Sequence, residues 1–246
     1  MAVKIDIVIP SMGRADRVVT KNCIRNAVLC VPESEEKAYQ EHNPGMPILT
    51  HPDTLKGLAR KRQFIYEHFP NSFQIDDDIK HIQRIYTESG ERAALDADEA
   101  YDIVQFCGNM AKMAGCYLFG FHKDPNPLGY HEMHPIRMTG ILNGCVGLLE
   151  GSKLYFSEKA VVSEDYWICA LNAYYHRKLW CDERFAICGA DTFHNGGGCS
   201  NYRTLKQEEE DTLFLRKTFG EVIVLKQDTS IAKRKHEFQR SLKIPF

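Results

Sequence analysis

Hydrophobic and polar positions alternate with two different periods along the first third of the chain. In KIDIVIPS, residues 4–11, the side chains of Ile5, Ile7 and Ile9 fall on one face. This period of two predicts a strand, which Pro10 ends. Similar short apolar runs and amphipathic segments follow in turn. The further predicted strands are residues 27–32, 46–52 and 72–79, and the predicted helices are residues 17–26, 34–42 and 57–69.

Strand and helix therefore alternate four times, which predicts an α/β fold with a mostly parallel sheet and helices on its faces. In such sheets, ligands bind beyond the carboxyl ends of the strands. The residues that follow each predicted strand should then line one crevice. These residues are 11–14, Glu33, 51–53 and 76–78.

The second half of the chain has a different pattern. Helices are predicted over residues 96–114, 163–179 and 205–219, and strands over 116–122, 138–153 and 221–226. A loop rich in Pro and Gly and a glycine-rich loop separate these elements, and no linker is long enough to divide independent domains. We therefore expect one domain over residues 1–246, with a nucleotide-binding half at 1–90 and an acceptor half at 91–246.

Composition restricts the class of protein only weakly. The 246 residues contain 31 Lys and Arg against 33 Asp and Glu, so net charge indicates no particular partner. We expect no secretory leader and no membrane anchor, because no apolar run approaches the roughly 20 residues of a membrane span. Nine cysteines occur singly with no CxxC pair, a pattern typical of reduced thiols in a cytoplasm.

The candidate chemistry begins with three consecutive aspartates behind the fourth predicted strand. Asp76 and Asp78 should point to one side and Asp77 to the other, because side chains alternate along an extended chain. Two carboxylates on one side are hard oxygen ligands, suited to Mg²⁺ or Mn²⁺ shared with the phosphates of a substrate. A solvated acidic turn is the alternative. The position behind a strand favours the ligand site.

A second acidic pair, Glu164 and Asp165, follows Ser163 at the start of a predicted helix. Ser163 is a candidate N-cap, and acidic residues in the first turn favour the helix dipole. The same position allows one carboxylate to point into a cleft as a general base.

The helix predicted at residues 57–69 starts with small and basic residues, among them Gly57 and Arg62. Exposed N–H groups and cations at a helix start would favour a diphosphate. A solvated basic face explains this segment equally well.

Taken in order, four segments resemble the GT-A type of nucleotide-sugar glycosyltransferase. The segments are IDIVIPSMGRAD from residue 5, GLARKRQ from residue 57, FQIDDDI from residue 73 and SED from residue 163. Lys61 and Gln63 stand where the family pattern has Ala and Asn. The resemblance implies a Rossmann-like mixed, mostly parallel sheet flanked by helices and a nucleoside-diphosphate sugar as donor, with UDP-sugar favoured.

The resemblance also implies roles for individual residues. Those bordering the donor would be Pro10, Ser11, Arg14, Asp53, Gly57, Arg62, Asp76 and Asp77. Asp78 and Asp76 would bind Mn²⁺ or Mg²⁺, with His236 or His194 completing the metal shell. Asp165, beside Glu164, would deprotonate the acceptor hydroxyl, and attack from the opposite face of the sugar would invert its anomeric carbon.

The overall appearance of the chain resembles the small phage-type glycosyltransferases associated with TET-like dioxygenases. This resemblance implies 5-hydroxymethylcytosine in DNA as the acceptor and, for a phage protein, the host cytoplasm as location. A basic tail at residues 232–243 suits a phosphate backbone, although such tails are often only solvated ends. Phe121, Tyr130, His131 and His134 could stack on an extruded base or could pack within the loop.

Four other interpretations stay open. The acceptor could be a protein, glycan or small molecule. A sugar-nucleotidyltransferase would show a denser glycine loop than SMGRAD, and a DNA-binding module without catalysis would not need Asp76 and Asp78. A zinc site is the last. Its ligands would be Cys181, Cys188, His194 and Cys199, but their spacing fits no standard pattern.

Overall fold

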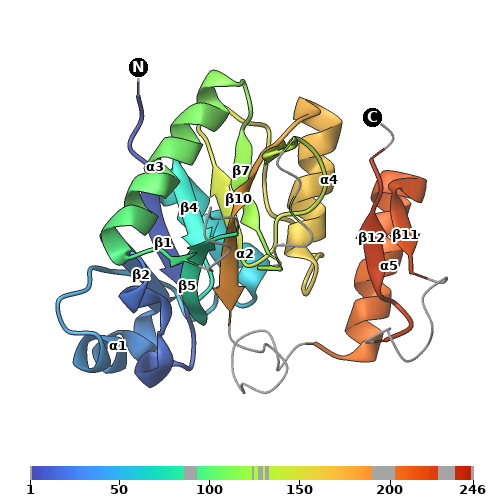
Figure 1. The fold of residues 1–246 in the computed structure, drawn as a ribbon. Coiled ribbons are helices and arrows are strands. Elements are labelled where there is room, and N and C mark those ends of the chain that lie inside the picture. Colours follow the sequence, from blue (N-terminus) through green and yellow to red (C-terminus); the bar gives the residue numbers. More distant parts are fainter. Residues whose placement is uncertain are drawn as a thin grey trace.

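The computed structural model describes residues 2–85, 93–123, 125–126, 130, 133–189, 203–226 and 236–244. Within these residues the chain forms a ten-stranded sheet in the order β3-β2-β1-β4-β9-β7-β10-β5-β6, with β8 beside β10 (Figure 1). The strands are β1 (Asp6–Pro10), β2 (Ala27–Pro32), β3 (Ile48–His51), β4 (Ser72–Ile75), β5 (Ile79–Arg84), β6 (Ala93–Ala94), β7 (Leu118–His122), β8 (Ile136–Arg137), β9 (Cys145–Leu148) and β10 (Trp180–Gly189).

The sheet is mixed, and most of its strands run in one direction, as the sequence predicts. β1 pairs in parallel with β2 and β4, and β2 with β3, which gives the first half of the sheet one orientation. β9 lies antiparallel between β4 and β7, and β10 then pairs in parallel with β7. The parallel half is buried on both faces, which explains why β1 and β2 read as nearly continuous apolar runs.

The helix predicted at residues 17–26 is replaced by two short 3-10 turns, at Ala15–Arg17 and Thr20–Asn22. The physical reason is competition for backbone hydrogen bonds. The amides of Val19 and Thr20 donate to the carbonyl of Asp77, at 3.0 and 3.3 Å, instead of continuing a helix. The Thr20 hydroxyl donates to the carbonyl of Asp76 at 2.6 Å and accepts from the Ile79 amide at 2.9 Å. This segment therefore pins the acidic triplet in place.

Helices cover both faces of the sheet: α1 (Glu36–His42), α2 (Leu58–His68), α3 (Ala97–Met113), α4 (Glu164–His176) and α5 (Leu205–Phe219) (Figure 1). A capping box between Asp96 and Glu99 begins α3, which packs against the face that carries Ile7 and Phe119. Leu118 points to the other face and packs with α4. The alternation along β7 thus separates two hydrophobic clusters.

The last part of the described chain packs on α4 (Figure 1). Here α5 is followed by a two-stranded sheet of β11 (Ile223–Leu225) and β12 (Arg240–Leu242). The rings of Trp167 in α4 and Phe214 in α5 stack with centroids 5.3 Å apart. The cluster that contains Leu118 extends through α4 to Ile223, which supports the proposal that residues 1–246 form one domain. Among the described helices, none has the length and apolar character to span a membrane.

The packing at β9 generates a stability prediction. Gly147 pairs with Phe73 on one side and Phe119 on the other, and these two rings stack with centroids 5.8 Å apart. A Cβ added at Gly147 would overlap the Phe119 ring. We expect Gly147→Ala to lower the free energy of unfolding by about 1–3 kcal/mol, because the core must shift to admit a methyl group.

Urea denaturation measures this effect, and Gly189→Ala is the matched control. A Cβ at Gly189 would meet Ile79 at 3.5 Å, an ordinary contact, so that variant should change stability by less than about 1 kcal/mol. An equal loss of unfolding free energy in the two variants would contradict the conclusion that the Phe119 ring leaves no room for a side chain at Gly147.

Candidate active site

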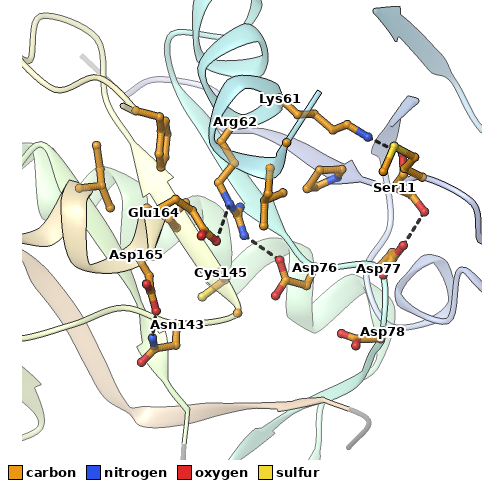
Figure 2. A pocket seen from close by; sticks show the side chains of 18 of the residues that line it. Ser11, Lys61, Arg62, Asp76, Asp77, Asp78, Asn143, Cys145, Glu164 and Asp165 are labelled. Atoms are coloured by element: carbon orange, nitrogen blue, oxygen red, sulfur yellow. Dashed lines mark hydrogen bonds and ion pairs between the residues drawn. The ribbon is translucent and has the colours of Figure 1, made fainter. Parts of the chain in front are cut away.

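A cavity of about 410 Å³ opens beyond the carboxyl ends of β1 and β4, beside the first turns of α2 and α4 (Figure 2). Its position agrees with the predicted crevice at the ends of β1 and β4, but Glu33 and residues 51–53, which were predicted to line the same crevice, are not part of the lining. Ten of the twelve predicted site residues line the cavity: Pro10, Ser11, Arg14, Gly57, Arg62, Asp76, Asp77, Asp78, Glu164 and Asp165.

The other two predicted residues lie elsewhere. The Asp53 carboxylate accepts hydrogen bonds from the amide and hydroxyl of Ser34, at 3.2 and 2.7 Å, and is not part of the cavity lining. His236 is also absent from the lining, and its Nε2 atom lies 3.9 Å from Glu208. His194 and Cys199 lie outside the described residues. Phe121 is 1 % exposed within the core, so of its two interpretations packing is the correct one.

The central aspartate of the triplet is a structural group. Asp77 accepts a hydrogen bond from the Ser11 hydroxyl and forms an ion pair with Arg14 at 2.8 Å. Its side chain is only 8 % exposed. The Ser11 hydroxyl also lies 2.7 Å from the Tyr39 hydroxyl. Asp77 therefore ties the turn after β1 to the end of β4, and burial raises the pKa of its carboxyl group.

The flanking aspartates face the cavity, while Asp77 turns toward Ser11 (Figure 2). Asp76 forms an ion pair with Arg62 at 2.7 Å, and a third of its side chain is exposed. Asp78 has weaker compensation, because Nη1 of Arg14 lies 3.9 Å away. Burial and the carboxylates of Asp76 and Asp77 raise the pKa of Asp78 to about 6. Asp78 is thus a buried carboxylate with little compensation from the cations around it.

Two basic residues of α2 point inward from the opposite wall. Lys61 is 5 % exposed and donates to the carbonyl of Ser11 at 2.7 Å. Arg62 is 4 % exposed and lies between two carboxylates, with Asp76 at 2.7 Å and Glu164 at 3.8 Å (Figure 2). The alternative of a solvated basic face is therefore wrong for these two side chains. A buried cation must face an anion or other acceptor.

Gly57 forms the N-cap of α2 with φ at +93°, a left-handed conformation that favours glycine. A Cβ there would meet nothing within 4 Å, so the space in front of the helix is open. The first turn of an α-helix leaves backbone N–H groups without partners inside the helix, and Gly57 and Leu58 at the start of α2 line the cavity, an arrangement that suits phosphate oxygens.

The second acidic pair enters from the first turn of α4. Asp165 accepts from the Tyr166 amide at 2.8 Å with one oxygen and from the Asn143 side-chain amide with the other (Figure 2). Burial raises the pKa of both Glu164 and Asp165, and the negative charge of Asp165 raises that of Glu164 further. Ser163 occupies the predicted N-cap position, but its side chain makes no capping hydrogen bond.

Sequence reasoning missed Asn143, which orients Asp165. Its position between Leu142 and Gly144, ahead of a short buried strand, carries no motif that marks it. A second cavity of about 480 Å³ shares Asn143 and Lys123 with the first, and His122 and Arg137 also line it. Arg137 is held there by Glu183 at 2.6 Å. Basic groups therefore border the space beside Asn143, the residue that contacts Asp165.

The residues present fit a divalent cation that is shared with a substrate. Among the described residues, no group of three or more His, Cys, Asp and Glu side chains is arranged to hold a metal by itself. Asp76 and Asp78 supply two carboxylates on the cavity side. Mg²⁺ commonly binds one or two carboxylates and takes its other ligands from phosphates and water. Cys181, proposed as a zinc ligand, is fully buried and accepts from Arg137 at 3.2 Å.

A comparison with protein families agrees with these motifs. The family model described as TET-Associated Glycosyltransferase matches residues 5–198. No curated protein matches the chain in sequence. One solved structure that matches is a CMP:2-keto-3-deoxy-manno-octonic acid synthetase complexed with CTP, at 10% identity and a TM-score of 0.43. That match covers 87% of this chain and 100% of the synthetase, and at this level it supports no functional argument.

The crowded carboxylates generate a second stability prediction. Ionised Asp78 is disfavoured in the folded chain because its pKa is raised from 3.8 to about 6. Asp78→Asn removes that charge and should raise the free energy of unfolding at pH 7.5 by up to about 3 kcal/mol.

Because the pKa of Asp78 is raised in the folded chain, the stability gain in Asp78→Asn should depend on pH. Below pH 4 the carboxyl group is protonated in both the folded and the unfolded chain, so the gain should vanish as pH falls from 7 toward 4. Urea denaturation in the presence of EDTA measures it, with Asp102→Asn on the exposed face of α3 as control. A gain that is constant with pH would contradict the assignment to Asp78 ionisation.

Proposed function

The chain belongs to the TET-associated glycosyltransferase family and is therefore a glycosyltransferase, and we propose that it transfers a sugar from a nucleoside-diphosphate sugar to 5-hydroxymethylcytosine in DNA. One observation carries the chemical part of this proposal. Asp76 and Asp78, the first turn of α2 and the Glu164–Asp165 pair converge on a single cavity. The acceptor follows from the association with TET, whose products carry the hydroxymethyl group.

The donor lies across the ends of β1 and β4 in this proposal. Pro10, Ser11 and Arg14 border the base and ribose, and UDP is the favoured nucleotide. The cavity volume of about 410 Å³ falls within the range of small-molecule sites. The diphosphate faces the open N-terminus of α2 beyond Gly57, with Lys61 and Arg62 behind it.

Asp76 and Asp78 are the residues that would hold Mn²⁺ or Mg²⁺. When bound, the cation supplies Lewis-acid stabilisation of the negative charge that develops on the departing diphosphate. Asp76 exchanges its ion pair with Arg62 for this role, and the guanidinium then faces the phosphates. The raised pKa of Asp78 supports the assignment, since its carboxylate has weak compensation from the protein.

Asp165 acts as the general base. It accepts the proton of the acceptor hydroxyl as that oxygen forms a bond to the anomeric carbon. The bond between this carbon and the phosphate oxygen breaks at the same time, and its electron pair leaves with the diphosphate. Attack from the face opposite to the leaving group inverts the anomeric carbon. The hydrogen bond from Asn143 fixes one carboxylate oxygen of Asp165.

The acceptor approaches through the second cavity, which shares Asn143 and Lys123 with the first and is also lined by Arg137 and His122. These groups suit the phosphates that flank a nucleotide in DNA. The eight cysteines that the structure describes are free thiols, and we place the reaction in a cytoplasm.

The decisive experiment incubates the protein with a panel of nucleotide sugars and three DNA duplexes, which contain cytosine, 5-methylcytosine or 5-hydroxymethylcytosine. Mass spectrometry should find the gain of one sugar on the last duplex only, in the presence of Mn²⁺ or Mg²⁺ and not after EDTA. Equal transfer to the cytosine duplex would contradict 5-hydroxymethylcytosine as the acceptor. Transfer at full rate in EDTA would contradict the requirement for a metal ion.

Two variants separate the role of the metal ligand from that of the base. Asp78→Asn should lower kcat at least about a hundredfold and abolish the effect of Mn²⁺ on UDP affinity in calorimetry. Asp165→Asn should lower kcat by about 10²–10⁴ and keep that effect, because the base does not contact the diphosphate. Asp102→Asn on exposed α3 is the control. An Asp165→Asn enzyme that retains wild-type kcat would contradict the assignment of the base.

A further inference from the structure

The described chain continues beyond residue 198, where the family match ends, and its C-terminal part reaches back to the active site. Arg240 at the start of β12 is only 4 % exposed. Its Nη1 atom donates to Thr212 at 2.7 Å and to Glu208 at 3.0 Å, both in α5. Its Nη2 atom donates to the hydroxyl of Ser163. One buried guanidinium thus joins α5 to the residue before Glu164.

Ser163 explains why this contact matters. A serine at the N-cap normally accepts a hydrogen bond from the first turn of its helix. Here the side chain makes no capping bond, and its oxygen accepts from Arg240 instead. The side chain of the N-cap residue of α4 is therefore fixed by β12 and not by the first turn of its own helix, and Glu164 and Asp165 follow it directly.

Two further contacts hold the same turn. The amide of Val162 donates to the buried carboxylate of Asp211 at 2.8 Å. The Tyr166 hydroxyl donates to the carbonyl of Arg240 at 2.6 Å, and the Arg240 guanidinium lies 5.0 Å from the centre of the Tyr166 ring. The C-terminal part thus contacts Val162, Ser163 and Tyr166, on both sides of the acidic pair.

We propose that Arg240 is a positioning residue, which fixes the turn at residues 162–166 and thereby the direction of the Asp165 carboxylate in the cavity. The inference rests on the proposed function, in which Asp165 is the base. Arg240 itself does not line the cavity. Small displacements of a base are costly, since a shift of about 1 Å can reduce a rate a hundredfold.

The charge of Arg240 also acts on Asp165. Burial raises the pKa of Asp165, while the Tyr166 amide and the cations Arg240, Lys123 and Arg203 lower it. The neighbouring Glu164 faces Arg62 on the other side and titrates together with Asp165. Loss of the positive charge at Arg240 should therefore raise the pKa of the base, which a purely mechanical support would not do.

The first arm of the test is hydrogen exchange of the protein without substrates. In Arg240→Met and in Ser163→Ala, a peptide covering residues 160–168 should exchange about tenfold or more faster than in the wild type, because a buried charged hydrogen bond is lost. A peptide covering β1 should be unchanged. The matched control is Arg184→Met, which removes an arginine from the buried carboxylate of Asp182 at 2.7 Å. Unchanged exchange at 160–168 in both Arg240→Met and Ser163→Ala would overturn the proposal.

The second arm measures sugar transfer as a function of pH. Arg240→Met should lower kcat about tenfold to a hundredfold with little change in the KM for the donor, and should move the acidic limb of kcat/KM to higher pH. In Arg240→Lys the acidic limb of kcat/KM should lie at the same pH as in the wild type, because lysine keeps the positive charge. Ser163→Ala should lower kcat without moving the limb.

The two arms separate the failure of this inference from the failure of the proposed function. A wild-type protein that transfers no sugar would refute the proposed function, and hydrogen exchange would still decide whether Arg240 holds the turn. An active wild type whose Arg240→Met variant keeps both kcat and the acidic limb would overturn the positioning role. Should Arg240→Met fail to fold, Ser163→Ala decides through its exchange and its kcat, since Arg240 keeps its contacts in α5.

Discussion

Ionised carboxylates in a half-enclosed cavity need cations or hydrogen-bond donors close by, and this constraint organises the whole site. Asp77 has two close partners, Ser11 and Arg14, and is part of the framework. Asp78 is compensated poorly, and its pKa rises accordingly. Asp76 lies between these cases, because its one strong partner, Arg62, is shared with Glu164. The degree of compensation thus distinguishes supporting carboxylates from those that can accept a new cation.

Local patterns in the sequence predicted the parallel half of the fold and most of the site. The periodicity of β1 to β4 depends on burial within each strand, and the carboxyl ends of neighbouring parallel strands necessarily meet at one edge. This rule brought Ser11 and the acidic triplet together without knowledge of any contact. The helix predicted at residues 17–26 failed because its amides bond to the carbonyl of Asp77, a partner that is distant in sequence. Propensity cannot anticipate that competition.

Two predicted site residues do not line the cavity: Asp53, which the strand pattern and the resemblance both indicated, and His236, which the resemblance alone implied. Asp53 and His236 belong to segments whose course depends on tertiary packing, and each found a local partner, Ser34 and Glu208. Asn143 was missed, and Arg240 was predicted only as a member of a basic tail, although the structure buries it. A single polar residue carries no period or spacing, and its role arises only when the fold brings it to Asp165 or Ser163.

The first turn of α4 is held between two buried guanidinium groups that come from opposite ends of the chain. Arg62 of α2 approaches Glu164, and Arg240 of β12 binds Ser163. A buried guanidinium can donate hydrogen bonds to several acceptors at once in a fixed planar geometry. A lysine ammonium also has several donors, but their directions are less fixed. Arg62 connects this turn to Asp76 and the donor side, whereas Arg240 connects it to α5. The turn that carries Asp165, the proposed base, is therefore held by two supports that have no common element, and each can be altered while the other remains.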